Sequence, residues 1–165
     1  MPVLYLNMKS RITRTLAAGF LAATTLLLAG GHTLATELKL RSQLVWGTDG
    51  AKPDGKDLVE LDGKLKDKLK ALRWKNYWVI KSQESRVGDK EQNAQLGKCA
   101  VQLRAVGNGQ LEVRLFSVDA DGKQKLLRTV TEAVERLDKG GALIIGGDSR
   151  DKWDDAWMVI ITTIR

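Results

Sequence analysis

Four aspartates crowd one short segment between two apolar stretches near the end of the chain, and two tryptophans, Trp153 and Trp157, lie among and just after them. Carboxylates beside an indole ring can hold Ca²⁺ or hydrogen-bond a sugar that stacks on the ring. The favoured alternative is a solvated loop whose acids pair with Arg150 and Lys152, because surface ion pairs carry little information. The aspartates of this candidate acidic loop are Asp148, Asp151, Asp154 and Asp155.

A second cluster of aromatic residues lies in RWKNYWVIK, residues 73–81. From Tyr77 on, the apolar residues follow the period of two that is typical of a strand, so Trp78 faces one side and Tyr77 the other. We expect Trp78 in the core, and Trp74 and Tyr77 near the surface. Covering the edge of the core is the favoured role for these two rings. The alternative is a stacking surface for a ligand, formed by Trp74, Tyr77, Trp153 or Trp157.

Residues 64–75 carry six basic side chains against one acid. Such a face can rest on anionic lipid or on an acidic polymer. The favoured interpretation is the solvated side of an amphipathic helix, where lysine is the usual residue. The candidate members of this basic face are Lys64, Lys68, Arg73 and Lys75.

The chain is poor in the side chains that most catalytic and metal sites use. Its one histidine, His32, lies in the N-terminal segment that we expect to be removed, and its one cysteine is Cys99. The remaining domain then has no histidine, so it holds neither a Ser-His-Asp nor a Cys-His arrangement. One cysteine makes no ordinary zinc site and no internal disulfide. Cys99 begins an alternating stretch, CAVQLRAV, and we expect it to be buried and unreactive. We therefore predict no metal, no cofactor and no catalytic residue.

The N-terminus has the order of a secretory signal. Lys9, Arg11 and Arg14 precede the apolar run 16–29, and small residues follow it. We predict cleavage after Ala35, with an uncleaved anchor as the alternative, although the apolar run is short of the roughly 20 residues that span a bilayer. Residues 36–165 then form one exported domain, periplasmic or extracellular, with no stable transmembrane anchor after cleavage. Removing residues 1–35 lowers the formal net charge from +7 to +4, and the remaining charges are interspersed, which argues against nucleic acid as a partner.

Periodicity predicts the elements that position these residues. Residues 37–46 alternate as a strand, and leucines spaced by three and four predict an amphipathic helix over 58–72, capped by Asp57 or Asp62. Glycine-containing turns at 107–109 and 121–122 are typical of hairpins. A calcium loop that starts near Asp119 is rejected, because Arg128 would occupy its last ligand position. Strands are predicted at 77–86, 91–96, 99–106, 111–118, 125–131, 142–145 and 157–164. The fold class is α+β: one N-terminal strand, one helix, then an antiparallel sheet, folded as a β-sandwich or partial barrel.

Several short segments together resemble a group of small exported proteins of unknown function from Verrucomicrobia-like bacteria. The resemblance covers most of residues 38–163 and implies a self-contained exported domain. It implies no activity, cofactor or catalytic residue. The segments that carry it are 44–47 (LVWG), 74–77 (WKNY), 97–99 (GKC), 144–148 (IIGGD) and 156–157 (AW).

Three functions are compatible with these residues. The favoured one is a non-enzymatic exported domain that binds or scaffolds a component of the cell envelope. The second is a carbohydrate-binding module that uses surface aromatic rings, so the expected partner is an envelope protein or a polysaccharide. The third is a small carboxylate-based hydrolase, which needs two acids about 5–10 Å apart in a cleft.

Overall fold

Alternating apolar and polar residues build most of the molecule into antiparallel strands. The computed structural model describes residues 37–52, 57–88, 90–150 and 155–164, with the backbone alone for 147–150. The predicted signal segment, 1–35, lies outside the described residues. The elements are β1 (Leu38–Thr48), β2 (Val59–Glu60), α1 (Gly63–Lys68), β3 (Asn76–Val87), β4 (Gln92–Gln95), β5 (Cys99–Ala105), β6 (Gln110–Val118), β7 (Gln124–Ala133), α2 (Val134–Asp138), β8 (Leu143–Arg150) and β9 (Ala156–Thr163).

The strands form two antiparallel sheets. The first has five strands in the order β2-β3-β1-β9-β8, and the second has four in the order β4-β5-β6-β7. Each predicted strand range overlaps an observed strand, so the predicted run of antiparallel strands is confirmed. The helices α1 and α2 have six and five residues. The described fold is therefore mainly β, and the helical part of the α+β prediction has little support.

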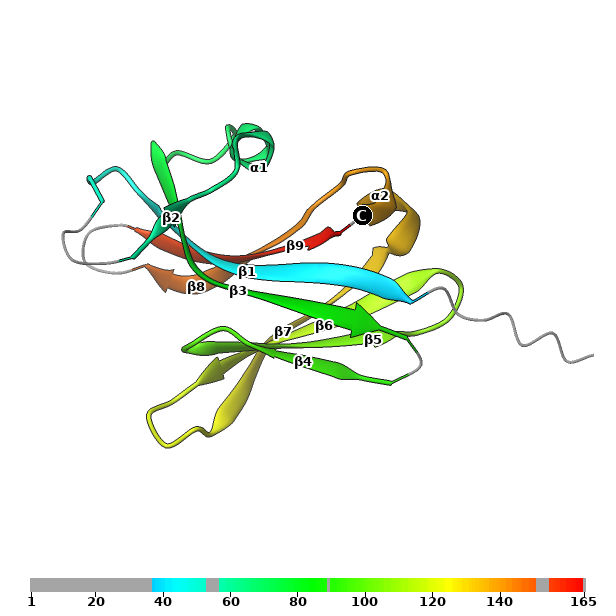
Figure 1. Cartoon of the computed structure of the whole chain (residues 1–165). Helices are drawn as coiled ribbons and strands as arrows, with labels where there is room; N and C mark the ends of the chain where they lie inside the picture. Colours follow the sequence, from blue (N-terminus) through cyan, green and yellow to red (C-terminus); the bar gives the residue numbers. More distant parts are fainter. Residues whose placement is uncertain (1–36, 53–56, 89, 151–154, 165) are drawn as a thin grey trace, which may run out of the picture. The chain divides into compact units, whose positions relative to one another are not determined.

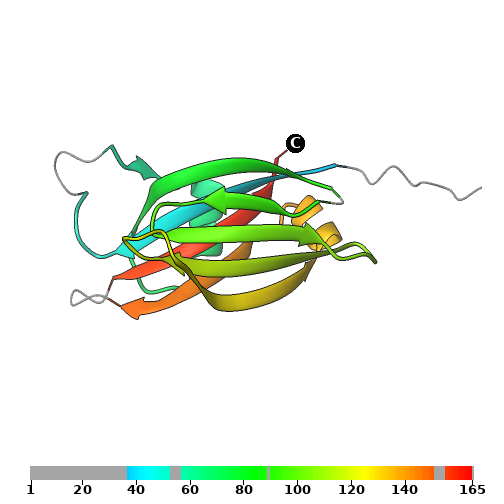
Figure 2. The ribbon, with the colours of Figure 1, turned by 90° about the horizontal axis from the view of Figure 1, so that it is seen from below.

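The two sheets face each other in Figures 1 and 2. One apolar cluster contains side chains from both sheets. Leu40 and Leu44 of β1 belong to it, as the alternation of that strand predicts, and Val101, Leu103 and Val113 of the second sheet meet them there. Gln83 ties β3 to the second sheet, because its amide donates to Asn93 O (3.3 Å) and accepts from Gln95 N (2.9 Å). Burial on this shared face sets the strand registers, since a slip by one residue exposes the apolar set.

The opposite face of the first sheet is also covered. Val45, Tyr77 and Ile160 point to this side and form a second apolar cluster with Leu61 and Leu69, which flank α1. In Figure 1, α1 lies on the side of β1 and β3 away from β4–β7. The first sheet is therefore buried on both faces near α1.

The predicted helix over 58–72 is much shorter in the structure. Asp62 is its N-cap, with a carboxylate that accepts from Lys64 N (3.0 Å), which confirms the later of the two predicted starts. Residues before the cap pair with β3 as β2. Leu61 and Leu69 still reach one cluster from outside the helix, so their spacing reflects shared burial and not one long helix.

Helix α2 was not predicted. It ends in a Schellman motif, in which Gly140 has φ +83° and donates to Leu137 O (3.0 Å), while Gly141 N donates to Arg136 O (3.0 Å). The glycine pair after a lysine is the sequence signal that predicts this helix end. No helix among the described residues is long and apolar enough to cross a membrane.

The predicted hairpin turns are confirmed. Asn108 has φ +50°, between two glycines that also have positive φ, and Gly122 has φ +79°. The Asp119 carboxylate accepts from the backbone N–H groups of Asp121 (3.1 Å) and Lys123 (2.8 Å). The acidic residue that suggested a calcium loop is thus part of the turn between β6 and β7.

Candidate functional site

A cleft of about 850 Å³ separates the two sheets at the end where β9 begins with Ala156 and Trp157. Small-molecule sites have volumes of about 300–1,000 Å³. We call this space the inter-sheet cleft. The first sheet contributes Leu44, Ile80 and Trp157 to its walls, and the second contributes Cys99 and Leu127. Both sheets thus supply apolar side chains to one concave surface.

A β-bulge in β3 shapes one wall of the cleft. The register of β1 against β3 shifts between Leu44 and Val45, and the shift leaves Ile80 as an extra residue. Beyond the bulge Lys81 pairs with Leu44, so it lies on the cleft side of the sheet. In a regular strand Lys81 would share a face with Val79, which packs on the second cluster. The bulge therefore places both Ile80 and Lys81 at the cleft.

The opposite walls carry two further irregularities. The pairing of β6 with β7 also shifts, and here Leu127 is the extra residue. The pairing of β8 with β9 breaks between Gly146 and Arg150, beside the position of Trp157. Bulges bend strands and re-aim side chains, and they are common next to functional sites. Extra residues from two strands, Ile80 and Leu127, line the same cleft.

The described lining of the cleft is apolar except at a few positions. Lys81 and Lys98 are its charged groups, both exposed, and no acidic residue or histidine belongs to the described lining. Ser117 adds a hydroxyl. Such a lining favours holding an apolar group over acid–base chemistry, which needs a titratable group near neutrality.

Cys99 was expected to be buried, and in the structure it is half-buried and lines the cleft. It is the first residue of β5 and packs against the first apolar cluster as a partly buried side chain. Burial still raises the pKa of the Cys99 thiol, which disfavours the reactive thiolate.

Three tryptophans lie side by side on the first sheet at the same end. Trp46 of β1 pairs in register with Trp78 of β3 and with Trp157 of β9, so the three share the face that carries the cleft. Each is half-buried. We call Trp46, Trp78 and Trp157 the tryptophan row. Of these three residues, the sequence predicts only Trp157 as a site residue. The alternation of residues 37–46 could have placed Trp46 on the same face as Leu40 and Leu44.

The geometry of the row favours packing over a flat platform. The rings of Trp46 and Trp157 are stacked, with centroids 6.1 Å apart and planes at 16°. Each ring of a stacked pair covers one face of the other, which leaves fewer free faces for a sugar. The Trp46 indole N–H donates to Asp155 Oδ2 (3.1 Å). Trp78 Nε1 is buried and has no hydrogen-bond partner among the described residues.

The predicted burial of Tyr77 and Trp78, in the segment 73–81, is reversed in the structure. Tyr77 is 2% exposed in the second cluster, and its hydroxyl donates to Leu69 O (3.2 Å). Burial, together with the nearby Asp49 charge, raises the pKa of Tyr77. Trp78 is the half-exposed ring, because it lies outside both apolar clusters. Alternation separated the two rings correctly, but segment 57–75 covers the face that was expected to be open.

Trp74 is half-buried against the second cluster, as expected of a ring at the edge of the core. A Cβ at Gly47 would lie 3.1 Å from its ring, which is tighter than ordinary contact, so a larger residue there would require the ring to shift. The Arg73 guanidinium lies 5.4 Å from the ring centroid, within cation–π range. Trp74 is thus on the opposite face of the first sheet from Trp157, and the structure does not bring these two candidates together.

Most of the candidate acidic loop lies outside the described residues. This holds for Asp151, Trp153 and Asp154, and for Asp148 only the backbone in β8 is described. Asp155 is 5% exposed and accepts the Trp46 hydrogen bond. Within the described ranges no three His, Cys, Asp or Glu side chains come together as metal ligands would.

The candidate basic face is divided by the short helix. Lys64 and Lys68 belong to α1, whereas Arg73 and Lys75 follow it in irregular chain. Lys68 donates to Gly140 O (2.8 Å). Neighbouring lysines of the same segment are paired with acids: Lys66 with Glu60, and Lys70 with Asp67. Two of the basic side chains in segment 64–75 are thus neutralised by ion pairs, which weakens the positive charge that the sequence indicates.

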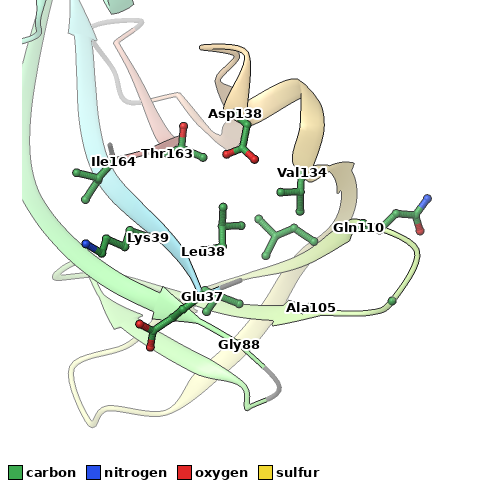
Figure 3. A pocket seen from close by; sticks show the side chains of 14 residues that line it. Glu37, Leu38, Lys39, Gly88, Ala105, Gln110, Val134, Asp138, Thr163 and Ile164 are labelled. Atoms are coloured by element: carbon green, nitrogen blue, oxygen red, sulfur yellow. The ribbon is translucent and has the colours of Figure 1, made fainter. Parts of the chain in front are cut away.

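A second cavity, of about 640 Å³, lies at the other end of the sheets. In Figure 3, Val134 and Asp138 of α2 border it opposite Leu38 and Lys39 of β1. Its charged groups have both signs, since Glu37 also lines it. This mixture indicates no particular ligand, so the inter-sheet cleft is the candidate site.

Comparisons with family models, with curated proteins and with solved structures give no match for this chain. The resemblance to small exported proteins of Verrucomicrobia-like bacteria therefore stays an expectation from short segments.

Proposed function

We propose that this chain is an exported, non-enzymatic β-sandwich domain that binds an apolar part of a cell-envelope component in the inter-sheet cleft. The observation that carries the proposal is the cleft itself. Bulged residues of two strands, Ile80 and Leu127, line it, and its described lining has no acid or histidine. A well-packed pair of sheets has no need of such a space, because interiors normally close around cavities.

The test is saturable binding of an uncharged apolar fluorophore, N-phenyl-1-naphthylamine, by the purified protein. Ser117→Trp places a large ring in the cleft and should abolish binding. Ser82→Trp is the matched control, because Ser82 is an exposed residue of β3 outside the cleft lining. Leu127→Gln serves as a second cleft variant, with thermal melting to confirm folding. Absence of saturable binding, or equal binding by both tryptophan variants, contradicts the proposal.

Carbohydrate binding is the second candidate, and the half-buried tryptophan row supports it. It predicts that a polysaccharide in a native gel retards the protein, and that Trp78→Ala removes the retardation while Ser117→Trp retains it. The opposite pattern, or no retardation, leaves the apolar cleft as the site. A carboxylate-based hydrolase has less support, because the buried Asp155 is engaged by Trp46.

Export is tested separately from binding. Cleavage after Ala35 in the native host predicts a mature chain that begins at Thr36. Intact-mass measurement of the exported protein checks this, and retention of residues 1–35 would show an uncleaved anchor instead.

A further inference from the structure

We propose that the ligand of the inter-sheet cleft is a single anionic amphiphile, with its apolar chain between the sheets and its acidic headgroup between Lys81 and Lys98. This inference rests on the proposed binding function and names the chemical class of the ligand. Both lysines line the cleft. They come from different sheets, Lys81 from β3 and Lys98 from the turn that precedes β5.

The position of Lys81 depends on the bulge. If β3 were regular, with Ile80 paired in the ladder, alternation would direct Lys81 to the face of Tyr77 and Val79, away from the cleft. One irregularity of the backbone therefore supplies an apolar wall residue and a cation next to it.

Lys98 is held by backbone hydrogen bonds on both sides of its turn. Its carbonyl accepts from Val118 N (2.8 Å), and Leu96 N donates to Cys99 O (2.7 Å). Gly97 takes a positive φ of +76°, which closes this turn. The backbone that carries the second cation is thus fixed against β6, on the opposite side of the cleft from β3.

Neither lysine has an ion-pair partner among the described residues. Lys66, Lys70 and Lys139, by contrast, each pair with a carboxylate in their own neighbourhood. Two like charges beside an apolar surface attract an anion, and the attraction is stronger where the surroundings exclude water. A neutral apolar ligand would use the walls and leave both cations without a counterion, and a cationic amphiphile would be repelled.

The experiment displaces N-phenyl-1-naphthylamine from the wild-type protein with decanoate, decanol or decylamine at neutral pH and low ionic strength. Decanoate should bind about tenfold more tightly than decanol, as expected for two partly exposed charge pairs, and decylamine should bind least. Lys81→Gln and Lys98→Gln should each weaken decanoate binding about two- to fivefold and leave decanol binding unchanged. Lys64→Gln is the matched control, because Lys64 lies on α1 and outside the cleft. High salt should reduce the preference for decanoate.

Two further measurements test where decanoate binds and whether the ligand is a single molecule or a lipid surface. Cys99 lines the cleft and is the one cysteine of the chain, so bound decanoate should slow its labelling by a maleimide. Sedimentation with vesicles of anionic phospholipid distinguishes docking on a lipid surface from uptake of one molecule. Sedimentation without displacement by free decanoate would overturn the proposal in favour of surface docking.

These measurements distinguish failure of the anionic ligand from failure of the proposed binding function. Equal affinity for decanoate and decanol, or a preference that survives the Lys81→Gln/Lys98→Gln double variant, overturns the anionic ligand while the apolar cleft stands. Failure of the fluorophore to bind at all removes the proposed function, and the present inference with it.

Discussion

Truncating Tyr77 should cost far more stability than truncating Trp78, although Trp78 is the larger ring. A buried aromatic side chain removes about 150–250 Å² from water. At about 25 cal/mol per Å² this is worth about 4–6 kcal/mol, and large aromatic-to-alanine changes in cores cost about 3–5 kcal/mol. Tyr77 is 2% exposed, so Tyr77→Ala should fall in that range. Tyr77→Phe removes only the bond to Leu69 O and should cost about 1 kcal/mol.

Trp78→Ala should cost about 1–2 kcal/mol. The ring is half-exposed, which reduces the area term, and its buried N–H has no partner among the described residues, so its removal returns part of a penalty of about 1–3 kcal/mol. Urea unfolding followed by circular dichroism measures both variants, and an unchanged slope confirms that midpoints are comparable. Equal losses for Tyr77→Ala and Trp78→Ala would refute the interpretation that segment 57–75 buries Tyr77 on one face of the first sheet while Trp78, on the other face, stays half-exposed.

Three further predictions use the same unfolding assay or thiol chemistry. Ser42 is fully buried in β1, and its hydroxyl has no hydrogen-bond partner among the described residues. Ser42→Ala should therefore stabilise the protein by about 1 kcal/mol. A loss of stability would instead show that the hydroxyl makes a hydrogen bond. Gly141→Ala should destabilise by about 1–3 kcal/mol because its Cβ would lie 2.3 Å from Arg136 O. Gly63→Ala, with open space around the new methyl group at the start of α1, should stabilise by about 0.5–1 kcal/mol, and equal effects at both glycines would contradict this contrast. Burial raises the pKa of the Cys99 thiol, so its rate of labelling should be low at neutral pH. The rate should increase only at a pH above the pKa of a free thiol. The stability that the neutral thiol contributes should likewise be lost as the pH rises through the folded-state pKa, whereas rapid labelling at neutral pH would show an exposed, unshifted thiol.

Local patterns in the sequence were enough to locate the strands other than β2 and the predicted hairpin turns. Alternation from Leu38 to Leu44 predicts which residues of β1 face the shared core, because successive side chains of a strand point to opposite sides. Positive φ at Gly107, Asn108 and Gly109 follows from residue types that tolerate the left-handed region. The cap at Asp62 follows from a side chain that can accept from the first turn of α1. These features depend on neighbours within a few positions.

The assignment of faces and the cleft depended on contacts between distant segments. Alternation separated Tyr77 from Trp78, but only the packing of Leu61 and Leu69 on the first sheet made Tyr77 the buried ring. The short α1 has the same origin, because pairing of β2 with β3 competes with helix formation in the segment before Asp62.

The bulges are the clearest case of a feature that only the tertiary structure decided. A bulge is a property of two paired strands, since it exists only where one strand has a residue that its partner lacks. Nothing in the local sequence around Ile80 or Leu127 marks them as extra residues, because each continues an apolar stretch. Their partners, β1 and β6, decide the register, and the register decides that Ile80, Lys81 and Leu127 meet at one cleft.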